Sequence, residues 1–163
     1  MECLRQLSVS DGWDVYNLLQ HIGEVENAFK NPVKKMSYGE FKQWLVQQDA
    51  WSRNENLPDG YVGQTCFWLI VDNVPVAFGK IRHALTPASR LQGGNIGYAV
   101  SSEFRGRGYG TKILNLLLQK AEEMNIQEKL LSVEKFNMAS KRVIEKNGGS
   151  IVSENQYRWF FSF

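Results

Sequence analysis

Apolar residues recur along this chain with two periods, every second position in some stretches and every three or four positions in others. The first period is typical of strands and the second of helices. In the first half of the chain these periods predict a strand, two helices and a hairpin of two strands. The elements are expected at residues 2–9, 13–22, 37–49, 65–71 and 75–82.

The second of these helices has a well-defined start in the sequence. Ser37 stands three residues before Glu40, which is the spacing of a capping box at a helix N-terminus. The segment 54–60 after the helix reads Asn-Glu-Asn-Leu-Pro-Asp-Gly and is therefore predicted to be a loop. Because loops on a rigid scaffold often carry specificity, we expect this loop to face the substrate.

The second half of the chain begins with a loose segment over 85–94, rich in Pro, Ser and Gly. A strand, a glycine-rich turn and a long helix follow, and the apolar positions of this helix fit one face that packs on a sheet. A further strand, a short helix and two closing strands complete an α+β arrangement around one mixed sheet. These elements are expected at residues 95–100, 111–124, 130–133, 137–146 and 151–163.

Composition and charge argue against several classes of function. The 163 residues carry 19 basic and 17 acidic side chains, a net charge of +2, so no broad cationic surface for nucleic acid is expected. The two cysteines, Cys3 and Cys66, fit neither a disulfide framework nor a metal-binding spacing, which indicates a reducing compartment and no metal. The sequence has no stretch of 18 apolar residues and no secretion signal, so we expect a cytoplasmic protein without a membrane partner.

The most informative segment is Arg105-Gly-Arg-Gly-Tyr-Gly110, which lies between a predicted strand and the start of the long helix. Unpaired backbone N–H groups and the positive end of the helix dipole meet at such a turn, so it is expected to hold a phosphate. The glycine spacing matches neither the Gly-x-Gly-x-x-Gly of dinucleotide sites nor the Gly-x-x-x-x-Gly-Lys-Ser/Thr loop of nucleoside triphosphate sites. Taken alone, the segment also fits an ordinary solvated loop.

Arg105, Gly108 and Gly110 instead form Arg-x-x-Gly-x-Gly, and in this respect the chain resembles the GNAT superfamily of N-acetyltransferases. A second family signature follows in the same order, since Asn137 opens a helix that ends at Gly148. Alone, these two residues also fit ordinary helix caps. The resemblance covers essentially the whole chain. It implies the family's fold, a single domain over residues 1–163 with a central mixed, largely antiparallel and twisted sheet flanked by helices.

The resemblance also implies the ligand. In the family, the glycine turn wraps the pyrophosphate of acetyl-CoA, and the preceding strand lines the pantetheine arm. A backbone amide near Ala99 or Val100 would then polarise the thioester carbonyl. The cofactor-binding residues implied by the resemblance are Tyr98, Ala99, Val100, Arg105, Gly106, Arg107, Gly108, Tyr109, Gly110, Thr111 and Asn137.

The implied reaction transfers the acetyl group to a primary amine by direct attack, which needs a base for the amine and benefits from an acid for the thiolate. Glu134 and His83 are the candidate bases, although each also fits a role at the surface. Many family members carry a tyrosine acid seven residues after the signature asparagine, but here that position is Ile144, which cannot donate a proton. Ser140 matches a branch of the family with Asn-x-x-Ser and is the candidate acid. A serine in a first helical turn can equally bond the backbone.

Two other functions stay open at the level of sequence. The missing tyrosine also fits a catalytically weak acyl-CoA-binding sensor or partner module, and a phosphate-binding fold unrelated to CoA would make the second signature a coincidence. The acceptor is open too, because a small molecule and a peptide fit equally well. Acidic side chains near the predicted loop, at Asp49, Glu55 and Asp59, would suit a cationic amine, whereas Arg82 and Arg90 would suit an anionic acceptor.

Two groups of aromatic residues allow alternative interpretations. The first group would line an acceptor pocket or pack in the core, and consists of Trp44, Trp51, Tyr61 and Trp68. The second group lies in residues 157–163 and would form either an interface or a buried final strand. A monomer and a homodimer are therefore both compatible with the sequence.

Overall fold

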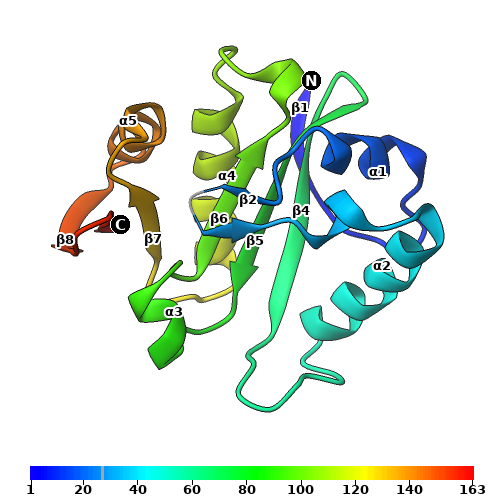
Figure 1. Ribbon diagram of the computed structural model, residues 1–163, viewed down its shortest axis with the longest axis horizontal. Coiled ribbons are helices and arrows are strands. Elements are labelled where there is room, and N and C mark those ends of the chain that lie inside the picture. Colours follow the sequence, from blue (N-terminus) through cyan, green and yellow to red (C-terminus); the bar gives the residue numbers. More distant parts are fainter. Residues whose placement is uncertain (27) are drawn as a thin grey trace.

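Four antiparallel strands form the main sheet, in the order β1-β4-β5-β6 (Figure 1). The computed structural model describes residues 1–26 and 28–163. A second sheet of three strands has the order β7-β9-β8, and β2 pairs with β3 in a short hairpin. The strands are β1 (Glu2–Gln6), β2 (Val25–Glu26), β3 (Phe29–Lys30), β4 (Gln64–Val71), β5 (Val74–Arg82), β6 (Ile96–Val100), β7 (Leu130–Glu134), β8 (Ser150–Glu154) and β9 (Arg158–Ser162).

Helices cover both faces of the main sheet. The helices α1 and α2 pack on one face, near the β2–β3 hairpin, and α4 packs on the other (Figure 1). The helix α5 lies beside β7 and α4. The helices are α1 (Trp13–Gln20), α2 (Tyr38–Ser52), α3 (Pro87–Leu91), α4 (Tyr109–Glu123) and α5 (Met138–Lys146), with the 3-10 helices η1 (Pro32–Lys35) and η2 (Ser102–Phe104).

Alternate residues of β4 and β5 supply two hydrophobic clusters, one on each face of the main sheet. Trp68 and Phe78 pack with the apolar stripes of α1 and α2, whereas Leu69 and Ala77 pack with α4. This division follows from strand geometry, in which successive side chains point to opposite faces. Trp68 Nε1 also donates a hydrogen bond of 2.7 Å to the buried carboxylate of Asp11, which holds the start of α1 against the sheet.

The two larger sheets meet at Asn95, just before β6. The Asn95 backbone N–H donates to the Leu130 carbonyl (2.9 Å), its side-chain amide donates to the Glu128 carbonyl (2.7 Å), and its side-chain oxygen accepts from the Leu130 N–H (2.8 Å). Gly94 adopts a φ of +71° beside it, and a Cβ atom there would lie 2.1 Å from the Leu130 carbonyl oxygen. Past this junction, β6 pairs with β5 and β7 pairs with β9, so the two strands leave an opening between them.

Most of the predicted elements are confirmed. The capping box is present, because the Glu40 N–H donates to Ser37 Oγ (3.2 Å) and the Ser37 N–H donates to Glu40 Oε2 (2.7 Å). The α+β class, with a largely antiparallel sheet flanked by helices, is confirmed as well. Within residues 1–26 and 28–163, no helix combines the length and apolarity that crossing a bilayer requires.

The structure corrects one prediction and decides between two others. The segment 85–94, predicted to be loose, contains the short helix α3, which starts at a capping box between Thr86 and Ser89. The C-terminal aromatic stretch is a buried final strand, since β9 is the middle strand of its sheet and Phe160 and Phe161 are buried. The β2–β3 hairpin has no counterpart among the predicted elements, because strands of two residues are too short to show a period.

We expect Asn95→Ala to lower the free energy of unfolding by about 2–4 kcal/mol, because it deprives the buried Leu130 N–H and Glu128 carbonyl of their partners. Urea unfolding followed by tryptophan fluorescence measures this change. Asn115→Ala is the matched control, since Asn115 is exposed on α4, and it should change the value by less than about 0.5 kcal/mol. Equal losses in the two variants would contradict the assignment of the junction to Asn95.

Candidate active site

The turn of residues 105–110 leads from η2 into the N-terminus of α4. Gly106 and Gly108 have φ values of +77° and +82°, in the left-handed region where residues with side chains are strained. Gly108 is the N-cap of α4 and has no side chain to bond the first turn of the helix. The N–H groups of that turn are therefore available to an anion, which the helix dipole also favours.

A cleft of about 640 Å³ borders this turn and extends between β6, α4 and the start of α5. We call it the large cleft, and its wall also includes Glu26 of β2 and Glu134 at the end of β7. Every residue expected to bind the cofactor lines it apart from Arg107, whose guanidinium lies over the Phe104 ring, 5.5 Å from the ring centre. Both sequence signatures therefore border the same space.

Comparison with known families explains why the two signatures share this space. The family model described as Acetyltransferase (GNAT) family matches residues 25–149, a range that contains both of them. The chain belongs to the GNAT family. This membership excludes the alternative of a phosphate-binding fold unrelated to CoA.

Three similar proteins show how the likeness is distributed between sequence and fold. The uncharacterised N-acetyltransferase YobR of Bacillus subtilis (strain 168) is 35% identical over 66 residues, and the match covers 40% of this chain but only 27% of YobR. The ribosomal-protein-S5-alanine acetyltransferase from Vibrio fischeri superposes with a TM-score of 0.76 at 16% identity, over 99% of this chain and 92% of that one. The N-acetyltransferase PseH of Campylobacter jejuni, solved with acetyl coenzyme A, superposes with a TM-score of 0.66 at 12% identity, over 100% of this chain and 98% of that one. At such identities the two solved structures show a shared fold.

An ion pair connects the glycine turn to β2. Arg105 Nη2 forms an ion pair with Glu26 Oε1 at 2.6 Å, and Arg105 Nε donates to the Val100 carbonyl at 3.2 Å. Glu26 Oε1 also accepts a hydrogen bond of 3.1 Å from the Gly23 N–H. No local pattern singles out Glu26, because its partner is 79 residues away in the chain.

A smaller space of about 30 Å³, which we call the inner cavity, lies in the opening between β6 and β7. Side chains from β3, β5, β6 and β7 line it, including Phe29, Lys80, Arg82 and Ser132. Three residues line both the inner cavity and the large cleft, namely Glu26, Tyr98 and Ser140. The two spaces therefore meet at these three residues.

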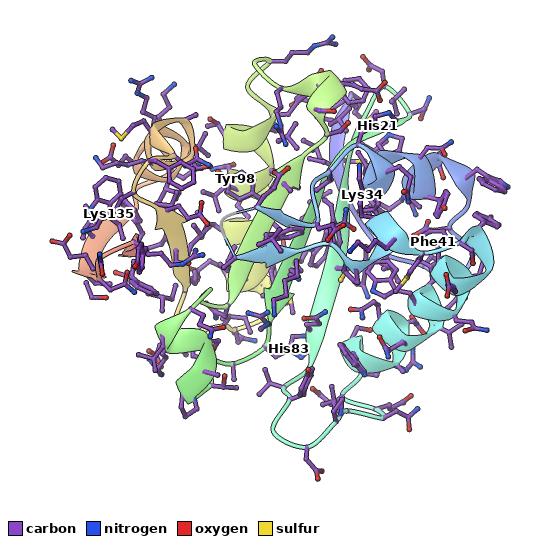
Figure 2. The ribbon with its side chains drawn as sticks, in the orientation of Figure 1. His21, Lys34, Phe41, His83, Tyr98 and Lys135 are labelled. Atoms are coloured by element: carbon purple, nitrogen blue, oxygen red, sulfur yellow. The ribbon has the colours of Figure 1, made fainter. Side chains whose placement is uncertain are left out.

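Tyr98 lies on β6, at the side of the strand that faces β7 and α5 (Figure 2). Its hydroxyl is buried and has no hydrogen-bond partner among the described residues. Burial raises the pKa of Tyr98 to about 12, and the nearby Ser140 side chain acts in the opposite direction. A neutral phenol, close to Ser140, thus stands where the two spaces meet.

The end of β7 and the start of α5 each bring one candidate catalytic residue to the large cleft. Asn137 is the N-cap of this helix, and its Oδ1 accepts a hydrogen bond of 3.1 Å from the Ser140 N–H. Glu134 ends β7 and forms an ion pair with Arg158 at 3.3 Å. Glu134 and Ser140 therefore share one wall of the large cleft, while Asn137 has the capping role that the sequence also allowed.

The third candidate, His83, lies apart from them. It lines neither the large cleft nor the inner cavity, and its Nε2 is 2.8 Å from Thr65 Oγ1, past the end of β5 (Figure 2). Burial lowers the pKa of His83, so its imidazole is neutral at pH 7. Ile144, at the position of the family's tyrosine, is fully buried in the cluster beneath α4 and belongs to the core.

The loop 54–60 and its aromatic neighbours border neither space. Trp44 and Trp68 are buried core residues. Trp51 and Tyr61 pack against each other, with their ring centres 5.6 Å apart. The aromatic residues considered for an acceptor pocket thus pack against other aromatic or core side chains.

The charged residues considered for acceptor binding are separated by the fold. Asp49 and Glu55 form ion pairs with Arg53, outside both spaces. Arg82, by contrast, lines the inner cavity together with Lys80. Of the five charged residues considered, Arg82 is therefore at the candidate site, whereas Arg90, Asp49, Glu55 and Asp59 line neither space.

Lys80 has no motif around it, although its spacing from Arg82 is informative. Two positions apart on one strand, these residues point to the same face of the sheet. Lys80 Nζ lies 4.6 Å from the centre of the Phe29 ring and 3.4 Å from the Lys30 carbonyl oxygen. Burial lowers the pKa of Lys80 to about 8 and also lowers that of Arg82.

The described residues form no evident centre for metal or thiol chemistry. Within the described part of the chain, no three His, Cys, Asp or Glu side chains gather as a group that could hold a metal ion. Cys66 is buried, and burial raises its pKa to about 12, so its thiol stays protonated. A protonated thiol is a poor nucleophile.

The lowered pKa of Lys80 gives an expected pH dependence of stability. Between about pH 8 and 10.5 the unfolded chain binds more protons at Lys80 than the folded protein, so rising pH stabilises the folded state in this window. The free energy of unfolding of the wild type should therefore rise relative to that of Lys80→Met from pH 7.5 to 10. Urea unfolding at several pH values measures it. A constant difference between the two proteins would show that Lys80 keeps its ordinary pKa.

Proposed function

We propose that this GNAT protein transfers the acetyl group of acetyl-CoA to the primary amine of a small molecule or a peptide. One observation carries the proposal, because the glycine turn before α4 and the Asn137 to Ser140 start of α5 line the same large cleft. When bound, acetyl-CoA supplies the acetyl group as a thioester. Membership of the acetyltransferase family supports the same activity.

The residues of the large cleft fit such a donor. A Cβ atom added at Gly106 or Gly108 would meet no heavy atom within 4 Å, so the outer side of the turn is open for the close approach of a phosphate. The wall formed by the end of β7 and by α5 adds apolar side chains beside Glu134 and Ser140, among them Val143 and Phe136, the latter 81% exposed. A polar end for a diphosphate thus continues into an apolar wall suited to an alkyl arm.

The strand β6 would position the reacting carbonyl group. Among the described strands, β6 pairs only with β5, so its other edge has free backbone groups toward the cleft. A backbone N–H near Ala99 or Val100 would stabilise negative charge on the carbonyl oxygen. Tyr98, at the meeting point of the two spaces, would help to exclude water there.

The chain would also move two protons. As the C–N bond forms and the C–S bond breaks, the amine loses a proton and the thiolate gains one. We assign the Glu134 carboxylate as the base that accepts the proton of the amine, and the Ser140 hydroxyl as the acid that donates a proton to the thiolate. Both side chains line the large cleft. His83, outside both spaces, has no such support from its position.

A catalytically weak acyl-CoA-binding module is the second candidate. Its support is Ile144, which occupies the position of the family's tyrosine acid and is fully buried. In this alternative the large cleft binds the donor and releases little thiol. Thiol release therefore separates the two functions.

The proposal extends to the setting of the protein. Acetyl-CoA and an amine are its partners, without a metal, nucleic acid or membrane. The charge balance and the two unpaired cysteines support a cytoplasmic, reducing location. A monomer and a homodimer both fit the proposal.

The first test is calorimetry of acetyl-CoA followed by a free-thiol assay over a panel of amines and N-terminal peptides. Gly108→Val should weaken acetyl-CoA binding by about 100-fold or more, because a branched side chain strains the turn and blocks the phosphate. Gly60→Val is the matched control, since Gly60 has a φ of +79° and open space around it but lies outside both spaces. Binding without thiol release would favour the binding module, and absence of binding by the wild type would overturn both functions.

Ser140→Ala should lower kcat by about 10²-fold or more if the hydroxyl protonates the thiolate. The affinity for acetyl-CoA should change little, because the turn and α4 are untouched. Steady-state thiol release and calorimetry on the same sample measure the two quantities. Ser150→Ala, at an exposed position of β8, is the control. An unchanged kcat in Ser140→Ala would remove the serine from the role of acid.

A further inference from the structure

Two cations line the inner cavity, and neither forms an ion pair with an acidic side chain among residues 1–26 and 28–163. We propose that the acceptor is an amine that also carries an anionic group, a carboxylate or a phosphate, and that Lys80 and Arg82 bind this group. The inference rests on the proposed acetyltransferase function and specifies its substrate. It would exclude polyamines, whose additional positive charges would lie beside Lys80 and Arg82.

The fold places these two cations close to the opening between the sheets. Lys80 and Arg82 stand near the end of β5, on the face that also carries Phe78. The hairpin covers this face, because Phe29 of β3 packs edge to face on Phe78 with ring centres 5.1 Å apart. A cation at either position is therefore partly removed from water, which is costly unless an anion compensates it.

The protein does not supply that anion among its described residues. Lys80 Nζ donates to the Lys30 carbonyl at 3.4 Å and lies over the Phe29 ring, and Arg82 Nη1 donates to the Gly94 carbonyl at 2.9 Å. One carboxylate lines the inner cavity, that of Glu26, and it is already paired with Arg105 at 2.6 Å. Two cations thus face a cavity whose single acid is committed elsewhere, which is the charge arrangement of an anion-binding site.

The same cavity leads to the reaction centre. Tyr98 and Ser140 line both the inner cavity and the large cleft, so a ligand anchored in the first reaches the second at these residues. The inner cavity is small, about 30 Å³, which suits a compact anionic group rather than a whole acceptor. An anchored anion would leave the amine end of the acceptor toward Ser140 and Glu134.

The test compares matched acceptors that differ in the anionic group alone. Amino acids are paired with their carboxamides, and phosphoethanolamine is paired with ethanolamine, with spermidine as the cationic arm. Thiol release gives kcat/KM for each. We expect the anionic member of one pair to be preferred, with carboxylate and phosphate distinguished by which pair shows the larger preference.

Variants show whether the two cations cause this preference. Arg82→Met and Lys80→Met should each reduce the preference for the anionic member by about tenfold or more, mainly through KM. The members of a pair differ in amine pKa, but this difference cancels when the preference of a variant is divided by that of the wild type. Arg90→Met is the matched control, because Arg90 pairs with Glu128 on the surface and lines neither space.

A binding experiment gives an answer that does not depend on turnover. Calorimetry with N-acetylated amino acids and their carboxamides, in the presence of CoA, should show binding of the carboxylate form and its loss in Arg82→Met. Equal binding of both forms, or equal preferences in the wild type and the Arg82 and Lys80 variants, overturns the anionic acceptor. Thiol release with neutral amines or spermidine as the best acceptors overturns it as well, but leaves the acetyltransferase in place. Absence of thiol release with every acceptor overturns the proposed function. The calorimetric comparison of carboxylate and carboxamide then still shows whether Lys80 and Arg82 form an anion-binding site.

Discussion

The hydrogen bonds of Asn95 determine where the opening of this molecule lies. They hold the start of β6 to the start of β7, and beyond this point, within the described part of the chain, β6 pairs with β5 and β7 pairs with β9. Both strands therefore present an unpaired edge to the space between them. An edge of this kind in open solvent is a liability for aggregation. In this fold the two edges border the inner cavity and the large cleft, where a ligand can use their polar groups.

The same opening accounts for two cations on a central strand. Strands inside a sheet seldom carry charged residues on a covered face, because burial of an unpaired charge is costly. Lys80 and Arg82 are tolerated because they stand beside the opening, under the β2–β3 hairpin. Gly97 allows the hairpin to approach, since a Cβ atom at this position would lie 2.8 Å from the Phe29 ring. The opening between β6 and β7, covered by the hairpin, thus accounts for both the positive charge and the small size of the inner cavity.

Local patterns predict the parts of the site that neighbouring residues determine. The capping box at Ser37 and the glycine turn before α4 are examples, and the turn borders a cleft as expected. The hairpin is not predicted, because its strands of two residues are too short to show a period. Contacts between distant segments leave no local pattern either, so the ion pair of Glu26 and the exposure of Lys80 to a cavity are not predicted. His83 shows why a candidate residue can be misplaced by sequence alone. It follows Arg82 directly, so its side chain points to the other face of the sheet, toward Thr65.

The ion pair of Arg105 with Glu26 joins the two ligand spaces through a single guanidinium. Arg105 belongs to the turn that borders the large cleft, and Glu26 belongs to the hairpin that covers the inner cavity. An anion that binds Arg105 competes with the Glu26 carboxylate for the same N–H groups. Loss of the Glu26 carboxylate would therefore free a guanidinium at the large cleft and remove a contact of the hairpin at the same time.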